Sequence, residues 1–148
     1  MNKKPAIKTK YRPFKISKSV GAVVINKHGQ VLVIFQKKNK YWEFPKGKVE
    51  QGERELDTLR RELFEETGIK KFQLLPKFRK VMKYDFKHNG KRIRRRVVYY
   101  CIVKPQERVR ISDEHTTYKW LPLAKARKIM KHTNQKKLID AVTKRIDG

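Results

Sequence analysis

Residues 47–69 read GKVEQGERELDTLRRELFEETGI, and their pattern predicts a loop followed by an α-helix. At about 100° per residue, Leu56, Leu59 and Leu63 share one apolar stripe of that helix. Gly68 fits the left-handed residue that commonly follows a helix. The carboxylates gather on a flank beside the stripe, at Glu55, Glu62, Glu65 and Glu66.

This acidic flank has the wrong sign for helix stability. Glu62 is three residues from Glu65 and four from Glu66, and like-charged pairs at those spacings cost a few tenths of a kcal/mol each. Glu65 and Glu66 also lie in the last turn, where the helix dipole disfavours anions by about 0.3 to 1 kcal/mol apiece. A bare Glu-x-x-Glu-Glu is typical of a solvated acidic face. Alternatively, a hard divalent cation such as Mg²⁺ or Mn²⁺ offsets the repulsion, because these ions prefer oxygen ligands.

The wider spacing distinguishes these alternatives, because residues 47–69 resemble the Nudix box. The family pattern is G-x5-E-x7-R-E-U-x-E-E-x-G-U, where U is apolar, and the stretch satisfies every position of it. The resemblance extends over most of residues 18–146 and implies one α/β/α sandwich around a mixed sheet. The box would form a loop-helix-loop at the edge of that sheet.

The resemblance also implies an activity, the hydrolysis of a nucleoside diphosphate linked to another group. Divalent metal, Mg²⁺ with Mn²⁺ as the alternative, would neutralise the pyrophosphate and acidify a water molecule. The general base varies among family members, so Glu65 is the first choice and Glu114 the second. Arg61 would brace the carboxylates through Glu53. The implied metal ligands are the Gly47 carbonyl, Glu62, Glu65 and Glu66, with Glu114 as an additional ligand.

Residues around the box resemble the branch that cleaves diadenosine tetraphosphate asymmetrically to ATP and AMP. Trp42-Glu-Phe-Pro-Lys46-Gly matches the W-x-x-P-K-G sequence that precedes the box in that branch, where the lysine contacts phosphate. Lys48 is a further candidate for substrate binding. Tyr99 and Tyr100 lie on a strand where that branch supports adenine stacking, but neighbouring strand residues point to opposite faces, so only one of them can line a cleft.

The net charge of +26 favours a second hypothesis, that the substrate is RNA. Residues 77–96 contain ten Lys or Arg and one acid, which predicts a polyanion-binding ribbon. The box also resembles the branch of RNA 5′-pyrophosphohydrolases, which act on triphosphorylated or capped RNA. Such an enzyme would use this positive charge to bind the RNA backbone. A non-catalytic RNA- or ribosome-binding protein with the Nudix fold is a third hypothesis. Biased composition is the alternative explanation of the charge, although a bias that raises lysine should also raise glutamate, which is much scarcer here. The candidate nucleic-acid residues are Arg92, Arg94, Arg95 and Arg96.

The sequence as a whole predicts one domain, residues 19–148, which contains the box. A flexible basic arm at residues 1–18 is expected to precede it. Strands are expected at 20–25 and 31–35 as a hairpin, at 81–86 and 93–103 around an Asn89-Gly90 turn, and at 109–111 and 118–121. Helices are expected at 124–132 and 135–146. The lone Cys101 cannot form an internal disulfide, which favours a cytoplasmic location, and the absence of an apolar run of about 20 residues argues against a membrane span. We expect a monomer or a homodimer.

Overall fold

The computed structural model describes residues 15–106, 108–113 and 115–147. Within them, seven strands form one mixed sheet. They are β1 (Lys15–Ile25), β2 (Gln30–Gln36), β3 (Tyr41–Glu43), β4 (Lys46–Lys48), β5 (Gln73–His88), β6 (Lys91–Val103) and β7 (His115–Pro122). The helices are α2 (Glu55–Thr67), α3 (Leu123–Ile129) and α4 (Thr133–Asp147).

The sheet is built around β1, which lies between β2 and β6 in the order β3-β2-β1-β6-β5. β1 runs parallel to β6 along its whole length, from Lys15 opposite Ile93 to Ile25 opposite Val103. β4 pairs with β1 and β7 pairs with β2, both antiparallel. Because β4 begins the box and pairs with the central strand, the box is held against the middle of the sheet.

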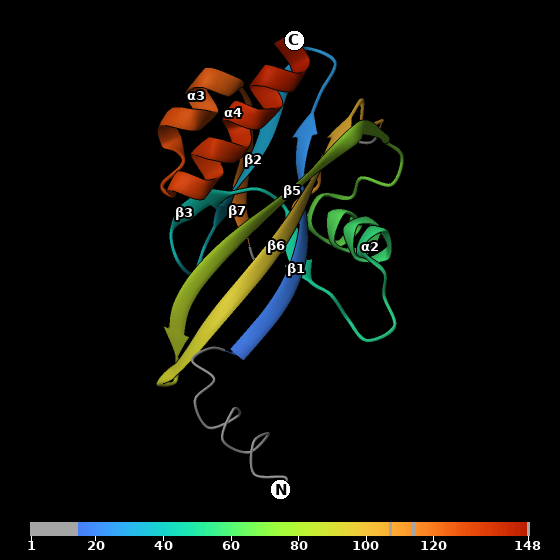
Figure 1. Ribbon diagram of the computed structural model, residues 1–148. Helices are drawn as coiled ribbons and strands as arrows, with labels where there is room; N and C mark the ends of the chain where they lie inside the picture. The colour runs from blue at the N-terminus through green and yellow to red at the C-terminus, as the bar shows by residue number, and fades with distance from the viewer. Residues whose placement is uncertain (1–14, 107, 114, 148) are drawn as a thin grey trace, which may run out of the picture.

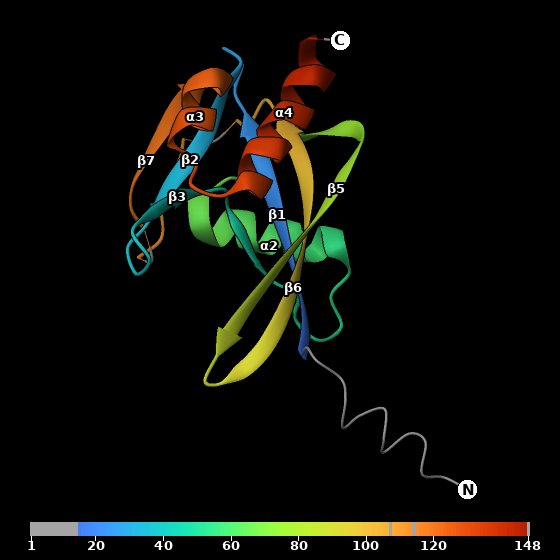
Figure 2. The ribbon, with the colours of Figure 1, turned by 60° about the vertical axis from the view of Figure 1, so that its left-hand side comes forward.

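The two faces of the sheet are covered by different helices (Figures 1 and 2). α2 packs on one face, where Leu59 and Leu63 join a buried cluster with Val20, Val24 and other strand residues. α3 and α4 cover the opposite face. The predicted α/β/α sandwich with a mixed sheet is therefore confirmed. Among the described residues, no helix combines the length and the apolar character that crossing a bilayer requires.

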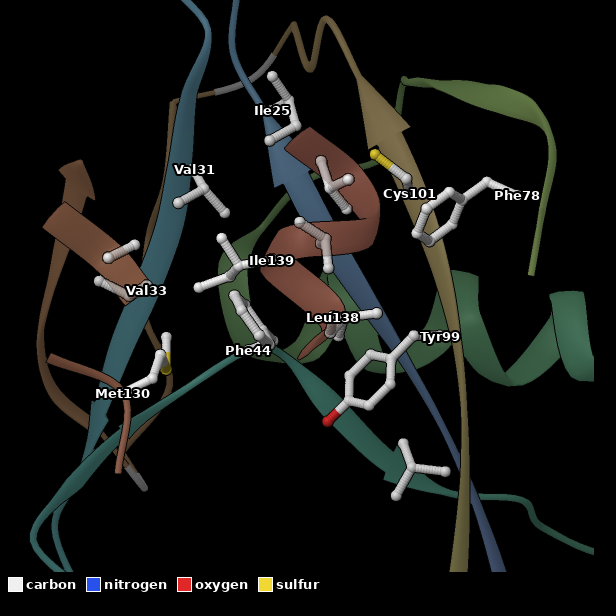
Figure 3. Packing of buried hydrophobic residues seen from close by; sticks show 14 residues of the cluster. Ile25, Val31, Val33, Phe44, Phe78, Tyr99, Cys101, Met130, Leu138 and Ile139 are labelled. Atoms are coloured by element: carbon white, nitrogen blue, oxygen red, sulfur yellow. The ribbon is translucent and has the colours of Figure 1, made fainter. Parts of the chain in front are cut away.

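Alternation along β6 distributes its side chains between the two cores. Tyr99 and Cys101 face α4, and Figure 3 shows the Tyr99 ring beside Phe44 and Leu138. The rings of Tyr99 and Phe44 meet edge to face, with centroids 6.1 Å apart. Tyr100 and Ile102 belong to the α2 side instead. The two adjacent tyrosines therefore belong to different cores.

The box helix ends where the sequence indicates. Gly68 has φ 78° and its N–H donates to the carbonyl of Phe64, which closes the last turn in the left-handed conformation. The turn between β5 and β6 also follows its sequence signal, since Asn89 and Gly90 both have positive φ, 51° and 76°. That combination is typical of a type I′ hairpin turn.

Three boundaries differ from the sequence-based expectation. β1 begins at Lys15, so residues 15–18, which the sequence assigned to the arm, extend the pairing with β6; residues 1–14 lie outside the described part. Residues 109–111 are no strand. There the N–H of Arg110 donates to the carbonyl of Thr67 at 2.8 Å, so the end of α2 replaces a neighbouring strand as the acceptor. The last two helices span Leu123–Ile129 and Thr133–Asp147.

Candidate active site

Arg61 is the centre of the carboxylate cluster. Its Nε donates to Glu53 Oε2 at 2.7 Å and its Nη2 to Glu53 Oε1 at 3.0 Å, so the predicted contact between these residues is present. Its Nη1 donates to Glu62 Oε2 at 2.5 Å and to Glu65 Oε1 at 3.1 Å. Nη2 also donates to the Lys48 carbonyl at 2.9 Å. One guanidinium thereby joins the start of the box to three of its glutamates.

Glu53 is the most firmly held of these carboxylates. Besides Arg61, it accepts from the Thr58 hydroxyl at 2.8 Å and from the Glu50 N–H at 2.9 Å. The bond from Arg61 is the main reason that the pKa of Glu53 falls to about 2. Glu53 therefore stays ionised and fixes the guanidinium of Arg61.

Glu66 lies in the opposite electrostatic setting. It is only 6% exposed, and its Oε1 accepts a hydrogen bond from the Lys46 N–H at 3.0 Å. Burial, followed by repulsion from Glu43 and Glu62, raises the pKa of Glu66 to about 8. Burial is also the main cause of the raised pKa of Glu62. A buried group of acids with raised pKa values favours an added cation.

Gly47 lies directly against this group. A Cβ at position 47 would lie 1.9 Å from the carboxyl carbon of Glu62, so only glycine leaves room for that side chain. Among the described residues, no three acidic, histidine or cysteine side chains are gathered closely enough to hold a metal ion as they lie. Instead, the Arg61 guanidinium lies between Glu62 and Glu65. The donors themselves, carboxylates beside a backbone carbonyl, fit a hard divalent cation.

A cleft of about 610 Å³ opens beside the buried acids. Glu43 and Lys46 line it from the box side, with the Lys46 ammonium 3.6 Å from Glu43 Oε1. Tyr99 lines it from the sheet, buried and with its pKa raised by desolvation. Lys46 therefore connects the cleft, through its backbone N–H, to Glu66.

Other predicted substrate residues lie elsewhere. Tyr100 faces α2, where its hydroxyl donates to Glu55 Oε1 at 2.5 Å, because the strand alternation gives the cleft to Tyr99. Trp42 packs edge-on against Phe35, with ring centroids 5.2 Å apart, and is not among the residues that line the cleft. The side chain of Lys48 is exposed and only its carbonyl contacts Arg61. Glu114 lies outside the described residues.

The four arginines of the hairpin separate in the structure. Arg94 pairs with Asp85 through two hydrogen bonds of 2.8 and 3.1 Å. Arg95 lines the cleft, and its guanidinium lies 5.1 Å from the centre of the Phe86 ring. The Nε of Arg96 is buried with no hydrogen-bond partner, and Arg92 is exposed. Only Arg95 of this group borders the candidate active site.

Sequence reasoning missed several residues of the cleft. Glu43 repels Glu66 from outside the box, and the box pattern gives no signal for it. Tyr41 and His132 meet edge to face at 5.3 Å on the cleft wall, and Tyr84 lines it from β5. An acid between two aromatic residues, as in Trp42-Glu43-Phe44, was the one available signal, because a buried acid needs a functional or ionic partner.

The geometry agrees with the family comparison. The family model described as the NUDIX domain matches residues 15–142. The chain belongs to the Nudix family. The match begins at the first residue of β1 and ends within α4, so the sheet, α2, α3 and most of α4 lie inside the Nudix domain.

Curated relatives of this Nudix domain carry two different names. An RNA pyrophosphohydrolase of Bartonella bacilliformis is 38% identical over 78 residues, covering 47% of this chain and 46% of that protein. The asymmetrical bis(5′-nucleosyl)-tetraphosphatase of Rattus norvegicus is 38% identical over 89 residues, covering 58% of each. The chain thus spans about half the length of the curated relatives it matches. A crystal structure of a C. elegans Ap4A hydrolase binary complex has a TM-score of 0.79 at 27% identity, covering 89% of this chain and 98% of that one.

Proposed function

We propose that this Nudix protein is a Mg²⁺-dependent pyrophosphohydrolase that cleaves diadenosine tetraphosphate asymmetrically into ATP and AMP. The observation that carries the proposal is the buried Glu66, shared between the acidic group and the cleft through Lys46. A carboxylate with its pKa raised to about 8 is costly to ionise, and bound divalent metal would offset that cost.

The metal would be held by Glu62, Glu65, Glu66 and the Gly47 carbonyl. When bound, it would supply charge neutralisation to the phosphates and an acidified water molecule as nucleophile. Arg61 would release Glu62 and Glu65 while it stays fixed on Glu53. The contacts of Arg61 with all three carboxylates support this part of the proposal.

The remaining residues bind and orient the substrate. Lys46, within the cleft, would hold a phosphate as a point charge. Tyr41 and Tyr99, which both line the cleft, would border the adenine ring. Glu65 would accept the proton of the attacking water, since its side chain is 54% exposed and reaches the cluster through Arg61. Glu114 is the second choice for the base.

Cleavage of diadenosine tetraphosphate is supported by two observations. The cleft has several aromatic walls, as a base requires, and the solved relative named as an Ap4A hydrolase covers nearly all of its own length in the match. The alternative, an RNA 5′-pyrophosphohydrolase, is supported by the curated relative of that name and by Arg95, which lines the cleft and could contact a further phosphate of an RNA.

Product analysis tests the proposal. The protein is incubated with Mg²⁺ and either diadenosine tetraphosphate or 5′-triphosphorylated RNA. ATP plus AMP supports the first function, and monophosphorylated RNA with released phosphate or pyrophosphate supports the second. If neither substrate gave a product and the protein bound RNA in a salt-sensitive way, both hydrolase functions would be contradicted. That result would favour a non-catalytic RNA- or ribosome-binding protein.

A further inference from the structure

A second cavity, of about 870 Å³, lies on the α2 side of the sheet, at the end where β1 and β6 finish. It shares no lining residue with the cleft beside the acidic box. Its walls come from the β1–β2 turn, from α2, from the connection between α2 and β5, from the segment that follows β6, and from β7. These walls contribute six cationic side chains, Lys27, Arg60, Lys70, Lys71, Lys104 and Arg108.

The charged side chains among the described lining residues of this cavity are all basic. No Asp or Glu is among its described lining residues, whereas the cleft contains Glu43 and Asp85 beside its cations. Glu107 lies outside the described residues. Lys27, Arg60, Lys104 and Arg108 converge on one concavity, where like charges repel one another and an anion of matching size would relieve that repulsion. The concentration of charge in a hollow, more than the net charge of the chain, distinguishes this surface.

The cavity also has aromatic walls. Phe72, Tyr118 and Trp120 line it, and each ring is half-buried against the α2-side core. The guanidinium of Arg60 lies 5.3 Å from the centre of the Phe72 ring. Half-buried rings keep one face or edge accessible, and arginine over an aromatic ring is an arrangement that also accepts a nucleobase.

Backbone hydrogen bonds hold two of the walls together. The Gln106 N–H donates to the Lys71 carbonyl at 3.2 Å, and Ser112 N–H donates to the Glu66 carbonyl at 3.2 Å. Lys104, at the end of β6, has φ 52°, a conformation that non-glycine residues seldom adopt and that is often found at binding sites. The cavity is therefore a built feature of the fold and is joined through the backbone to the end of the box helix.

We propose that this cavity is a second nucleotide-binding site, separate from the proposed hydrolytic cleft. The cations would contact the phosphates and the aromatic rings would contact the base. The volume lies within the range of about 300–1,000 Å³ that small-ligand sites occupy. A nucleoside diphosphate combines the negative charge and the flat ring that these walls recognise.

Trp120 gives a local readout of this site. The protein contains two tryptophans, Trp120 in the cavity and Trp42 in β3, so their indole N–H signals can be assigned by single substitutions to phenylalanine. ADP is titrated in EDTA, which prevents metal-dependent turnover. The Trp120 signal should move with saturation, and binding should weaken as salt rises. Inorganic pyrophosphate, which lacks a ring, should bind more weakly than ADP.

Paired variants locate the binding. The double variant Lys104→Ala/Arg108→Ala should raise the dissociation constant for ADP, measured from the Trp120 signal, about tenfold, because two exposed cations are lost. Lys125→Ala with Lys128→Ala on exposed positions of α3 removes the same charge and should leave the shift unchanged. An unmoved Trp120 signal, or equal weakening by both pairs, would overturn the proposal. Equal affinity for pyrophosphate and ADP would overturn the role of the rings.

Discussion

Glu66 is a residue on which stability and function make opposite demands. Its carboxylate is buried beside Glu43 and Glu62, and this setting raises its pKa to about 8. Between about pH 5 and pH 8 the folded protein without metal therefore holds a proton that the unfolded chain releases, and its stability falls as the pH rises. Glu66→Gln keeps an oxygen that can accept the Lys46 N–H bond and removes the charge.

We therefore expect Glu66→Gln to lower turnover with Mg²⁺ by about 100-fold or more while it stabilises the metal-free fold by on the order of 1 kcal/mol at pH 8. Urea unfolding in EDTA, at pH 5 and pH 8, measures the second effect, which should be larger at the higher pH. Glu65→Gln is the control for stability, because its side chain is 54% exposed. Near-wild-type turnover of the Glu66 variant would remove this residue from the metal site.

Gly47 is the second residue whose role can be separated from folding. A Cβ there meets the end of the flexible Glu62 side chain, which can swing away. Gly47→Ala should therefore lower turnover about tenfold or more and change the free energy of unfolding by less than about 1 kcal/mol.

Gly21→Ala is the matched control. A Cβ at position 21 would lie 2.7 Å from the Tyr99 ring and 2.8 Å from the Pro45 carbonyl, which is fixed backbone. This variant should lose about 1 to 3 kcal/mol of stability in the same urea experiment. If Gly47→Ala destabilised the fold as much as Gly21→Ala and both kept normal turnover per folded molecule, the approach of Gly47 to Glu62 would be structural only.

At the scale of elements, Glu55 fastens the first turn of α2 to three strands. It accepts hydrogen bonds from Lys18 in β1, Arg79 in β5 and Tyr100 in β6. The bond from Arg79 is the main reason that its pKa is lowered. A carboxylate with a lowered folded-state pKa stabilises the fold above its unfolded pKa of about 4.3, and that contribution is lost as the pH falls below it.

Glu55→Gln should consequently cost about 1 kcal/mol at pH 7 and much less near pH 3. Chemical unfolding of the wild type and the variant at both pH values measures the difference. Asp140→Asn, an exposed carboxylate paired with Arg127, should cost less at pH 7. If Glu55→Gln lowered the free energy of unfolding equally at both pH values, the packing of the side chain and not its charge would hold the helix.

The elements also show how far the sequence determines the fold. The box helix and the β5–β6 hairpin were predictable because each has a local stop signal, Gly68 and Asn89-Gly90. The parallel pairing of β1 with β6 was not predictable. The alternation of apolar and polar residues indicates which face of a sheet each residue occupies, but it does not indicate which strand lies next to which. Residues 109–111 alternate like a strand, but Val109 is buried against the α2 side while the neighbouring N–H of Arg110 bonds to the end of α2.

The candidate site was predictable where chemistry follows spacing and not where it follows topology. The 23-residue pattern of the box located Arg61 on Glu53 and brought Glu62 and Glu66 together. It gave no signal for Glu43 or the aromatic wall, because β3 and α4 reach the cleft only through the folding of the whole chain. The choice between Tyr99 and Tyr100 required knowledge of which face carries α4.

At the scale of the whole molecule, the charge of +26 predicts salt-sensitive binding of nucleic acid. Lys87 and Lys91 are exposed at the tip of the β5–β6 hairpin. Replacing both with Glu should weaken RNA binding and reduce its salt dependence, while the same replacements at Lys125 and Lys128 on α3 should have a smaller effect. Filter binding at several salt concentrations measures both. If both pairs of replacements weakened RNA binding equally, the total charge of the protein and not the β5–β6 hairpin would determine binding.

The central claim is that the acids of the box bind a divalent cation, which would offset the cost of ionising the buried Glu66. Titration of Mn²⁺ followed by electron paramagnetic resonance tests it most directly, with Asp140→Asn as a remote charge-matched control. We predict saturable Mn²⁺ binding to the wild type and the control, and strong loss of that binding in Glu66→Gln. Equal Mn²⁺ binding by all three proteins, or none by the wild type, would contradict the account.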